Sequence, residues 1–449
     1  MKIEVVLIDS IDGDNLTSLK NYDENKNLFE INKFEAKKNQ MVFLANLDSS
    51  DEVSTLVVGT KGCETAYEFV NLGSLIGKKI GQDCDIQLIS KSDNLDIFSI
   101  EFGIAISSYN FDNFKSKKNP ERNFKILDSS HNEEIQNKID SIFWVRDLIN
   151  TPALDKSPEA FIDKVNNLVD SSGIKVEVYD KEWLEENNFG AVLGVGKGSE
   201  RPPYFLVGKY NPDAKYQIAL IGKGVLFDSG GYSLKSPSGM ETMKTDMSGA
   251  ASAWGVINLV ARTNQKIGLT VYTPIVENMV SGSAIRPGDV LKTRNGKTIE
   301  VMNTDAEGRL IMADALAFAS EAMPDLICDI ATLTGASYVA LGLDIGAVLS
   351  NNRDLEKKFI ESSENIGEHF HPLPLFDQYR KLIDSDIADM KNTGGRFGGA
   401  ITAALLLREF IGDNNWIHLD IAGPARSDNR KGATGFGVTS LYEFMKNLD

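Results

Sequence analysis

The chain has 449 residues, of which 42% are hydrophobic and 25% are charged, and its formal net charge is −17 at pH 7. This length predicts two or three domains, and the composition is ordinary for a globular protein whose core needs no disulfides. The acidic balance disfavours general binding to nucleic acids or to anionic membranes, and no apolar stretch is long enough to span a bilayer. The three scattered cysteines, Cys63, Cys84 and Cys328, favour reduced thiols in a cytoplasmic protein.

Residues 1–130 are predicted to form a smaller N-terminal α/β domain, because strand and helix signals alternate along them. The first apolar run contains acids and has no small-residue cleavage site, so it indicates a strand and not a signal peptide. The predicted strands are 3–8, 42–47, 54–59, 85–89 and 97–106, and residues 64–79 have the apolar spacing of a helix. The polar and basic residues 110–125 are predicted to form a linker or exposed loop.

Residues 131–152 are predicted to form a linker helix that has acids in its first turn and ends before Pro152. A larger α/β domain follows at residues 153–449. Its predicted strands are 174–180, 216–224, 267–277, 325–333 and 416–423, and its predicted helices include 239–263, 308–322 and 398–411. The near-continuous apolar strands predict a mostly parallel central sheet that is flanked by helices on both faces.

Charged residues follow several of these strands, at the positions where ligands bind in open α/β sheets. The set comprises the carboxylates Asp228, Asp246, Asp305 and Glu307 and the cations Lys223, Lys235 and Arg309. Four carboxylates in one cleft cannot all stay ionised without strong cations. Two divalent metal ions would balance their four negative charges, as in two-metal hydrolytic sites.

Residues 303–310, NTDAEGRL, place Asp305, Glu307 and Arg309 at alternate positions. If the segment is extended, all three side chains lie on one face. The two acids would then be metal ligands, and Arg309 would hold a neighbouring anion. The alternative is a solvated turn with a chance charge pattern. Asp246 is predicted to lie inside a helix near Met243 and other apolar residues, where a carboxylate needs a partner.

Several other chemistries have no support in the sequence. The four histidines, His131, His369, His371 and His418, form neither HExxH nor a pair at helical ligand spacing, and His418 is interpreted as structural. No GxSxG elbow supports a serine triad, and no Walker A loop is present. A two-metal phosphatase stays a weaker alternative, because such sites usually use histidine ligands.

The charged segments together resemble the leucyl aminopeptidases of the cytosol aminopeptidase family. The resemblance is carried by GKGVLFDSGGYSLK (222–235), MKTDMSGAA (243–251) and NTDAEGRL (303–310), and it continues through DIATLTGA (329–336), GGRFGGAITAALLL (394–407) and WIHLDIAG (416–423). It covers about residues 145–449 and departs from the family pattern only beside the motifs, at Thr245, Ser248 and Tyr232. In this family the N-terminal domain is the variable part.

The resemblance implies a catalytic C-terminal domain that holds two divalent metal ions, Mn²⁺ or Zn²⁺, with Mg²⁺ or Co²⁺ as alternatives. The implied ligands are Lys223, Asp228, Asp246 and Glu307 for the tighter ion, and Asp228, Asp305 and Glu307 for the more exchangeable one. The implied catalytic residues are Lys235, which stabilises the oxyanion, and Arg309, which holds bicarbonate as general base. The implied pocket for the first side chain of the substrate contains Met243, Thr332 and Leu333.

The function implied by the resemblance is that of a metal-dependent leucyl aminopeptidase in the cytoplasm. It releases leucine and other, mainly apolar, residues from peptides with a free N-terminus, and it forms a homo-hexamer with 32 symmetry. Some family members also bind DNA through the N-terminal domain. The net charge of −17 argues against that second role here, and the basic run within residues 110–125 leaves it open.

Overall fold

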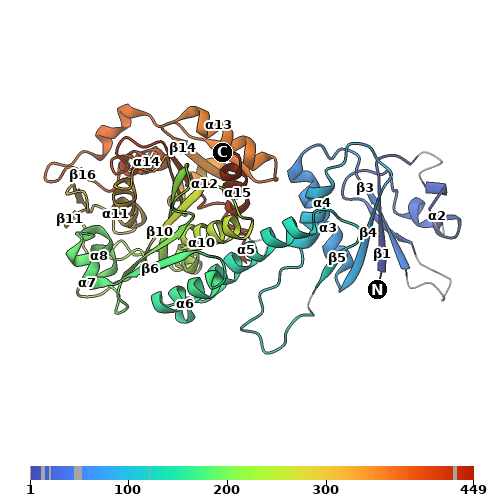
Figure 1. Cartoon of the computed structure of the whole chain (residues 1–449), viewed down its shortest axis with the longest axis horizontal. Helices are drawn as coiled ribbons and strands as arrows, with labels where there is room; N and C mark the ends of the chain where they lie inside the picture. The colour runs from blue at the N-terminus through green and yellow to red at the C-terminus, as the bar shows by residue number, and fades with distance from the viewer. Residues whose placement is uncertain are drawn as a thin grey trace. The chain divides into compact units, whose positions relative to one another are not determined.

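The structure is a computed structural model that describes residues 2–11, 16–19, 22–44, 53–120, 122–427 and 432–448. The chain divides into two compact units, one comprising residues 1–139 and 364–367 and the other residues 140–363 and 368–449 (Figure 1). The division falls within helix α5 (Asn132–Asn150), which ends before Pro152 as the sequence predicts.

The first unit contains a five-stranded sheet in the order β2–β3–β1–β4–β5. Its elements are β1 (Lys2–Ile8), α2 (Tyr22–Ile31), β2 (Met41–Leu44), β3 (Val53–Gly59), α3 (Ala66–Ile80), β4 (Cys84–Ser90), α4 (Ile97–Ile106) and β5 (Phe124–Ile126). The pairs are parallel except for β2, which runs antiparallel to β3. Because side chains alternate along β1, Val5 packs in the same cluster as residues of α3 and α4, whereas Val6 packs with residues of α2.

Residues 97–106, predicted to be a strand, form helix α4, so this prediction is wrong. The segment is apolar apart from the buried Ser99 and Glu101, and a mostly apolar run does not distinguish a buried strand from a buried helix. The side chain of Asp96 caps the helix by accepting a hydrogen bond from Ser99 N. Gly103 lets α4 approach α3 closely, because a Cβ atom there would lie 2.1 Å from Val70 O. Residues 45–47 of another predicted strand lie outside the described residues.

The second unit is built on a nine-stranded sheet in the order β15–β14–β17–β13–β8–β10–β7–β6, with β9 paired beside β10. Its strands are β6 (Lys175–Tyr179), β7 (Tyr204–Tyr210), β8 (Gln217–Gly222), β9 (Gly224–Asp228), β10 (Gly268–Asn278), β13 (Leu326–Ala331), β14 (Ile345–Ser350), β15 (His369–Pro372) and β17 (Trp416–Asp420). The central strands β17, β13, β8 and β10 are parallel, while β14, β7 and β6 introduce antiparallel pairs. The predicted α/β class with a mostly parallel sheet is confirmed.

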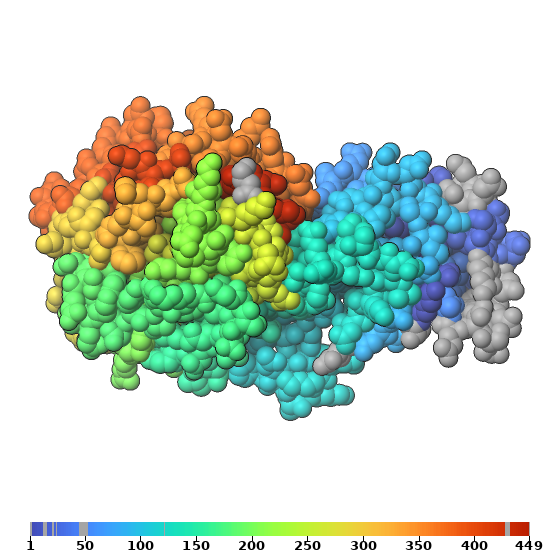
Figure 2. Space-filling view, in the orientation of Figure 1, coloured from blue at the N-terminus to red at the C-terminus, as the bar shows by residue number. Residues whose placement is uncertain are grey.

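Helices cover both faces of this sheet (Figure 1). They are α6 (Pro158–Val169), α7 (Lys181–Glu186), α8 (Gly190–Gly196), α9 (Pro237–Met240), α10 (Ser248–Arg262), α11 (Gly308–Ser320), α12 (Gly335–Leu341), α13 (Arg353–Glu364), α14 (Gly399–Arg408) and α15 (Val438–Lys446), with the 3-10 turns η1 (Ala153–Asp155), η2 (Met243–Thr245) and η3 (Asp377–Ile383). Ala219 and Ile221 of β8 pack in one cluster with α11, α8 and α14. Gly222 lies on the opposite face against Ala250 of α10. Figure 2 shows the α13 region (orange) and the α6–α8 region (green) at opposite edges of this unit.

Smaller strands complete the unit: β11 (Val290–Lys292), β12 (Thr298–Glu300) and β16 (Met390–Lys391) form one small sheet, and β18 (Arg426–Ser427) pairs with β19 (Gly432–Ala433). In the part of the chain that the structure describes, no helix has the length and apolar character needed to cross a membrane.

The continuous helix predicted for residues 239–263 is instead three pieces, α9, η2 and α10, so Asp246 lies in the turn before α10 and not inside a helix. A distant side chain contributes to this interruption. The buried Lys156 donates from Nζ to Lys244 O at 2.8 Å, and in a continuous α-helix that carbonyl would accept from residue 248. Lys244 in turn donates to Asn150 O at 2.6 Å, so the segment is tied to the end of α5.

Candidate functional site

Six charged side chains meet beyond the carboxyl ends of β8, β9 and β13. Lys223 lies between β8 and β9, Asp228 ends β9, and Asp246 precedes α10. The other three follow in loops: Lys235, Asp305 and Glu307. Ion pairs join them in two groups of three, one around Lys223 and one around Lys235. The structure therefore brings together every predicted metal ligand and the predicted catalytic lysine, at the sheet edge where the sequence places them.

Lys223 is the most buried cation of this cluster, with a side chain only 3% exposed. Its Nζ lies 2.8 Å from Asp246 Oδ1 and 3.0 Å from Glu307 Oε1, and it donates to Thr332 O at 3.0 Å. Burial disfavours the ammonium form, but the surrounding carboxylates outweigh burial and raise the pKa of Lys223 above its usual value. Gly308 is required beside it, because a Cβ atom there would lie 2.4 Å from Lys223 Cε.

Lys235 connects the other two carboxylates. Its Nζ lies 2.7 Å from Asp228 Oδ2 and also contacts Asp305 Oδ1. The second oxygen of Asp228 accepts from Gly230 N and from Asn278 Nδ2, each at 2.8 Å. Burial and the nearby Glu307 carboxylate raise the pKa of Asp228 to about 7. Both oxygens of Asp228 therefore have polar partners, yet its surroundings still disfavour the ionised form.

Three carboxylate oxygens of the cluster are buried and have no hydrogen-bond partner among the described residues: Asp246 Oδ2, Asp305 Oδ1 and Glu307 Oε2. Lys235 Nζ forms an ion pair with Asp305 Oδ1. A buried oxygen without a partner costs free energy unless something positive approaches it. Four carboxylates here face only two lysine charges. In addition, oxygen atoms of Asp228, Asp305 and Glu307 lie within 4.8 Å of one another. The unmatched oxygens and the excess negative charge fit divalent cations, which prefer oxygen ligands.

The segment 303–310 is not extended, so that hypothesis is wrong. Residues around Asp305 form a turn in which Asp305 N donates to Asn303 Oδ1 at 2.9 Å. Glu307 then starts α11, because its carbonyl accepts from Leu310 N and Ile311 N at 2.9 and 3.1 Å. The alternative of a solvated turn is also wrong, since Glu307 is only 1% exposed. The turn and the start of α11 together direct Asp305 and Glu307 into one cluster, so an extended strand is not needed to bring them together.

Arg309 lies apart from the ion-pair network. Its Nη1 donates to Asn392 O at 2.8 Å, whereas its buried Nε has no hydrogen-bond partner in the described part of the chain. No ion pair joins it to Asp305 or Glu307 among those residues. Burial lowers the pKa of Arg309 to about 10, against the attraction of Glu307 and Asp420. The structure thus places Arg309 near Glu307 but leaves part of its guanidinium group without a protein partner.

The three predicted pocket residues lie beside Asp246 and are partly exposed. Thr332 Oγ1 donates to Asp246 Oδ1 at 2.8 Å, and Met243 O accepts from Asp246 N at 3.3 Å. Leu333 follows Thr332, and its backbone N donates to Asp420 Oδ1 at 3.1 Å. Two of the three residues, Met243 and Thr332, therefore bond directly to Asp246.

Three supporting residues were not identified from the sequence. Asn278 donates to Asp228 Oδ1 and, at 3.0 Å, to Thr304 O. Thr304 Oγ1 donates to Gly230 O at 2.6 Å, and Asn392 Nδ2 donates to Asn303 O at 2.6 Å. Asn278 ends β10 at the same sheet edge, so its position after a predicted strand could have identified it from the sequence. Asn392 comes from a distant loop and has no such signal.

Comparisons with known proteins agree with this arrangement. Residues 143–442 match the catalytic domain of the cytosol aminopeptidase family. The "Probable cytosol aminopeptidase" of Clostridium perfringens is 39% identical over 436 residues, which cover 90% of this chain and 88% of that protein. The protein of the same name from Chlorobaculum tepidum is 38% identical over 455 residues, with coverage of 92% and 90%.

A solved structure, that of the bottromycin maturation enzyme BotP in complex with Mn, is 30% identical and matches with a TM-score of 0.89. The match covers 99% of this chain and 98% of that chain. The family match over most of the second unit and the near-full-length relatives lead to one conclusion: the chain belongs to the cytosol aminopeptidase family, and it is a peptidase of the aminopeptidase type.

Proposed function

We propose that the protein is a metal-dependent leucyl aminopeptidase, which removes leucine and other, mainly apolar, residues from the N-termini of peptides. The observation that carries the proposal is the pair of buried oxygens, Asp246 Oδ2 and Glu307 Oε2, that lack a hydrogen-bond partner in the described chain. Hydrolysis by protein side chains alone does not explain why four carboxylates surround two lysines, whereas the binding of divalent cations explains it.

The proposed ligands form two overlapping sets: Lys223, Asp228, Asp246 and Glu307 for a tighter ion, and Asp228, Asp305 and Glu307 for a more exchangeable one. Divalent ions held there, Mn²⁺ or Zn²⁺ with Mg²⁺ or Co²⁺ as alternatives, supply Lewis-acid chemistry that lowers the pKa of a water and polarises the scissile carbonyl. The solved structure of BotP contains Mn, which supports manganese among these candidates. Lys223 must lose its proton to be a ligand.

The other side chains of the site have proposed roles that their surroundings support. Lys235 is 17% exposed and stays charged, because the carboxylates beside it raise its pKa, so it is placed to stabilise a developing oxyanion. Arg309 keeps free donors in a planar fork that suits a small oxyanion, with bicarbonate as the proposed general base. Met243, Thr332 and Leu333 form the proposed pocket for the first side chain of the substrate. Asp246 lies next to this pocket, which supports a free α-amine that binds a metal ion alongside Asp246.

The proposed setting is a cytoplasmic homo-hexamer. The name of the relatives, cytosol aminopeptidase, supports the location. The resemblance to the leucyl aminopeptidases supports the hexamer. The alternative role of DNA binding through the first unit gains no support from the relatives, whose names mention only the peptidase.

The test is a panel of aminoacyl amides assayed after chelation and again with each of the four divalent ions. We expect leucine amide to be hydrolysed, hydrolysis to stop after chelation, and Mn²⁺ or Zn²⁺ to restore it best. N-acetyl-leucine amide lacks the free amine and is expected not to be cleaved. Full activity in a chelated, metal-depleted sample, or equal cleavage of the acetylated and free amides, would contradict the proposal.

A further inference from the structure

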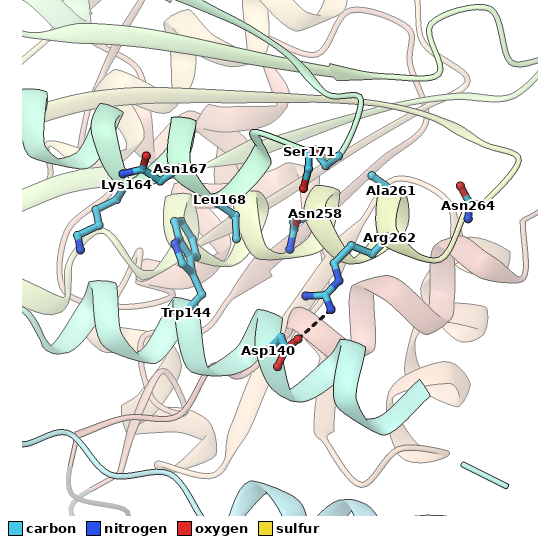
Figure 3. A pocket seen from close by; sticks show the side chains of 11 residues that line it. Asp140, Trp144, Lys164, Asn167, Leu168, Ser171, Asn258, Ala261, Arg262 and Asn264 are labelled. Atoms are coloured by element: carbon cyan, nitrogen blue, oxygen red, sulfur yellow. Dashed lines mark hydrogen bonds and ion pairs between the residues drawn. The ribbon is translucent and has the colours of Figure 1, made fainter. Parts of the chain in front are cut away.

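The second unit contains a cavity of about 750 Å³ at the C-terminal end of α10, between that helix, α5 and α6 (Figure 3). Its walls include Trp144 of α5, Leu168 of α6, and Asn258 and Arg262 of α10. The volume lies within the range of about 300–1,000 Å³ that is usual for ligand sites. The helix α10 begins two residues after Asp246, and Asn258 and Arg262 lie roughly 15–20 Å further along it at 1.5 Å per residue. The cavity is therefore separate from the carboxylate cluster.

Asn258 is the main reason to regard this cavity as a binding site. It is only 3% exposed, it lines the cavity, and its side-chain amide makes no hydrogen bond within the described residues. Asparagine is a poor helix former, and no described residue bonds to this amide, so helix stability does not explain its presence in the wall of the cavity. A primary amide offers one acceptor and two donors, which complement the N–H and C=O of a peptide group.

A cationic group lies on the same helix face. Arg262 follows Asn258 by four residues, so the two side chains are neighbours on α10. Figure 3 shows the Asn258 amide between Trp144 and Arg262. Arg262 Nη2 donates to Asp140 Oδ2 at 2.8 Å, and both side chains of this pair are 37% exposed. Since a guanidinium group has five N–H donors, this single bond leaves donors of Arg262 for a carboxylate.

The apolar wall completes the pattern. Trp144 follows Asp140 by four residues on α5, so it lies beside the ion pair, and Leu168 of α6 lines the same space. An indole ring contributes a large apolar surface for a ligand side chain. The cavity thus combines an amide-binding group, a carboxylate-binding group and an apolar surface.

We propose that this cavity binds the C-terminal end of a short peptide. The α-carboxylate pairs with Arg262, the last peptide group bonds to the Asn258 amide, and an apolar last side chain packs against Trp144. A free amino acid has the carboxylate but no peptide group, so it cannot match both the donor and the acceptor of the Asn258 amide, and it would leave the cavity largely unfilled. The site is distinct in chemistry from the candidate active site, because it recognises a C-terminus and not a free α-amine.

The test is calorimetric titration of the full-length, metal-loaded protein with N-acetyl-leucyl-leucine. Acetylation removes the α-amine, so the probe does not use the amine-binding feature of the active site. We expect one site per chain, and we expect the C-terminal amide of the same peptide to bind about tenfold or more weakly, because it cannot form the ion pair. Equal affinity for acid and amide, or no binding up to millimolar concentrations, would overturn the proposal.

Matched variants test whether the peptide binds in this cavity. Arg262→Gln and Asn258→Leu are each expected to weaken binding of the acid by about tenfold or more. Asp140→Asn breaks the same ion pair but keeps the arginine, so binding should be unchanged or tighter. Arg408→Gln is the control, because Arg408 is similarly exposed and forms its own ion pair with Asp377 at 2.7 Å.

Unchanged affinity in Arg262→Gln, or weakened binding in Arg408→Gln to the same extent, would overturn the assignment. If Asn258→Leu does not fold, the surface variant Arg262→Gln and the comparison of acid with amide still decide. Free leucine that binds as tightly as the peptide, in a manner that requires Arg262, would overturn the peptide assignment in favour of an amino acid. Leucine amide hydrolysis is measured separately, so failure of either proposal is recognised independently of the other.

Discussion

Asp228 and Asp314 are two buried carboxylates of the second unit whose pKa burial raises to the same value, about 7, but their surroundings differ. Asp314, on α11, accepts from Ala191 N and Val192 N at 2.9 and 3.0 Å with one oxygen and from Arg294 N at 2.8 Å with the other. These bonds satisfy it and cap the start of α8.

Asp228 lies among three further acids, Asp246, Asp305 and Glu307, each of which has a buried oxygen without a hydrogen-bond partner in the described chain. A shifted pKa therefore does not separate a functional acid from a structural one. What separates these two regions is the balance of charge and of hydrogen-bonding capacity. The Asp314 region is complete within the protein, whereas we propose that cations from outside match the buried oxygens of the Asp228 region.

The largest effect is expected for Glu307→Gln. The change removes one negative charge and one oxygen that both proposed ligand sets share, so we expect loss of bound metal and no measurable hydrolysis of leucine amide. Elemental analysis and the leucine amide assay check this. Asp314→Asn serves as the buried-acid control and should keep its metal. Two tightly held ions in Glu307→Gln would show that Glu307 is not a ligand.

Arg309→Ala is expected to keep both metal ions and to lose activity by about 10²–10⁴-fold, the usual contribution of general acid–base catalysis. The reason is that Arg309 lies outside the ion-pair network and offers free donors to an anion. After removal of dissolved CO₂, added bicarbonate should stimulate the wild type far more than the variant. Equal stimulation, or loss of metal, would give Arg309 a different role.

Metal affinity is expected to fall as the pH decreases below about 7. Without metal, the raised pKa of Asp228 means that it carries a proton below pH 7, and a cation must displace that proton. Each proton displaced lowers the apparent affinity by about tenfold per pH unit. When metal affinity is measured between pH 5 and 8, the plot of its logarithm against pH should therefore have a steeper slope below pH 7. A single constant slope across this range would contradict the assigned pKa of Asp228.

Asn278→Ala is expected to weaken metal binding by about 10–100-fold, as is usual when a residue that orients a metal ligand is removed. Asn278 holds Asp228 Oδ1 at 2.8 Å and is not a proposed ligand itself. The expected signature is lower metal affinity with near-normal turnover at saturating metal. A defect in turnover that excess metal does not correct would place Asn278 in the reaction itself.

The smallest effect on catalysis is expected for Asp314→Asn. The amide places an NH₂ group against backbone donors, which costs about 1–3 kcal/mol of stability, while hydrolysis should stay near the wild-type rate. The raised pKa of Asp314 also stabilises the fold at low pH, and this contribution is lost as the pH rises from about 4 to 7. In denaturant titrations, the free energy of unfolding of the wild type should therefore fall more over this pH range than that of the variant.

The sequence predicts most of the fold because the apolar runs that become β1, β8, β10, β13 and β17 are continuous and bounded by turns. It fails where long-range contacts decide the local structure. Residues 97–106 become a helix because they pack on α3, and the chain before α10 leaves the helical path where Lys156 takes the carbonyl of Lys244.

The candidate site divides in the same way. Lys223, Lys235 and the four acids are visible as charges after strands, and the structure brings them together. Their assigned roles stay predictions. Asn392, which supports Arg309 from a distant loop, is not visible in any local pattern, because only the folded chain brings it within 2.8 Å.

The measurement that tests the central difference most directly is the number of divalent ions that the wild-type protein binds. The chelated and dialysed protein is titrated with Mn²⁺ near pH 8 by calorimetry, with zinc as a second titrant. Two ions per chain, one held more tightly than the other, are expected from the overlapping ligand sets. Binding of no ion, or of only one at saturation, would contradict the two-metal site at Asp228, Asp246, Asp305 and Glu307.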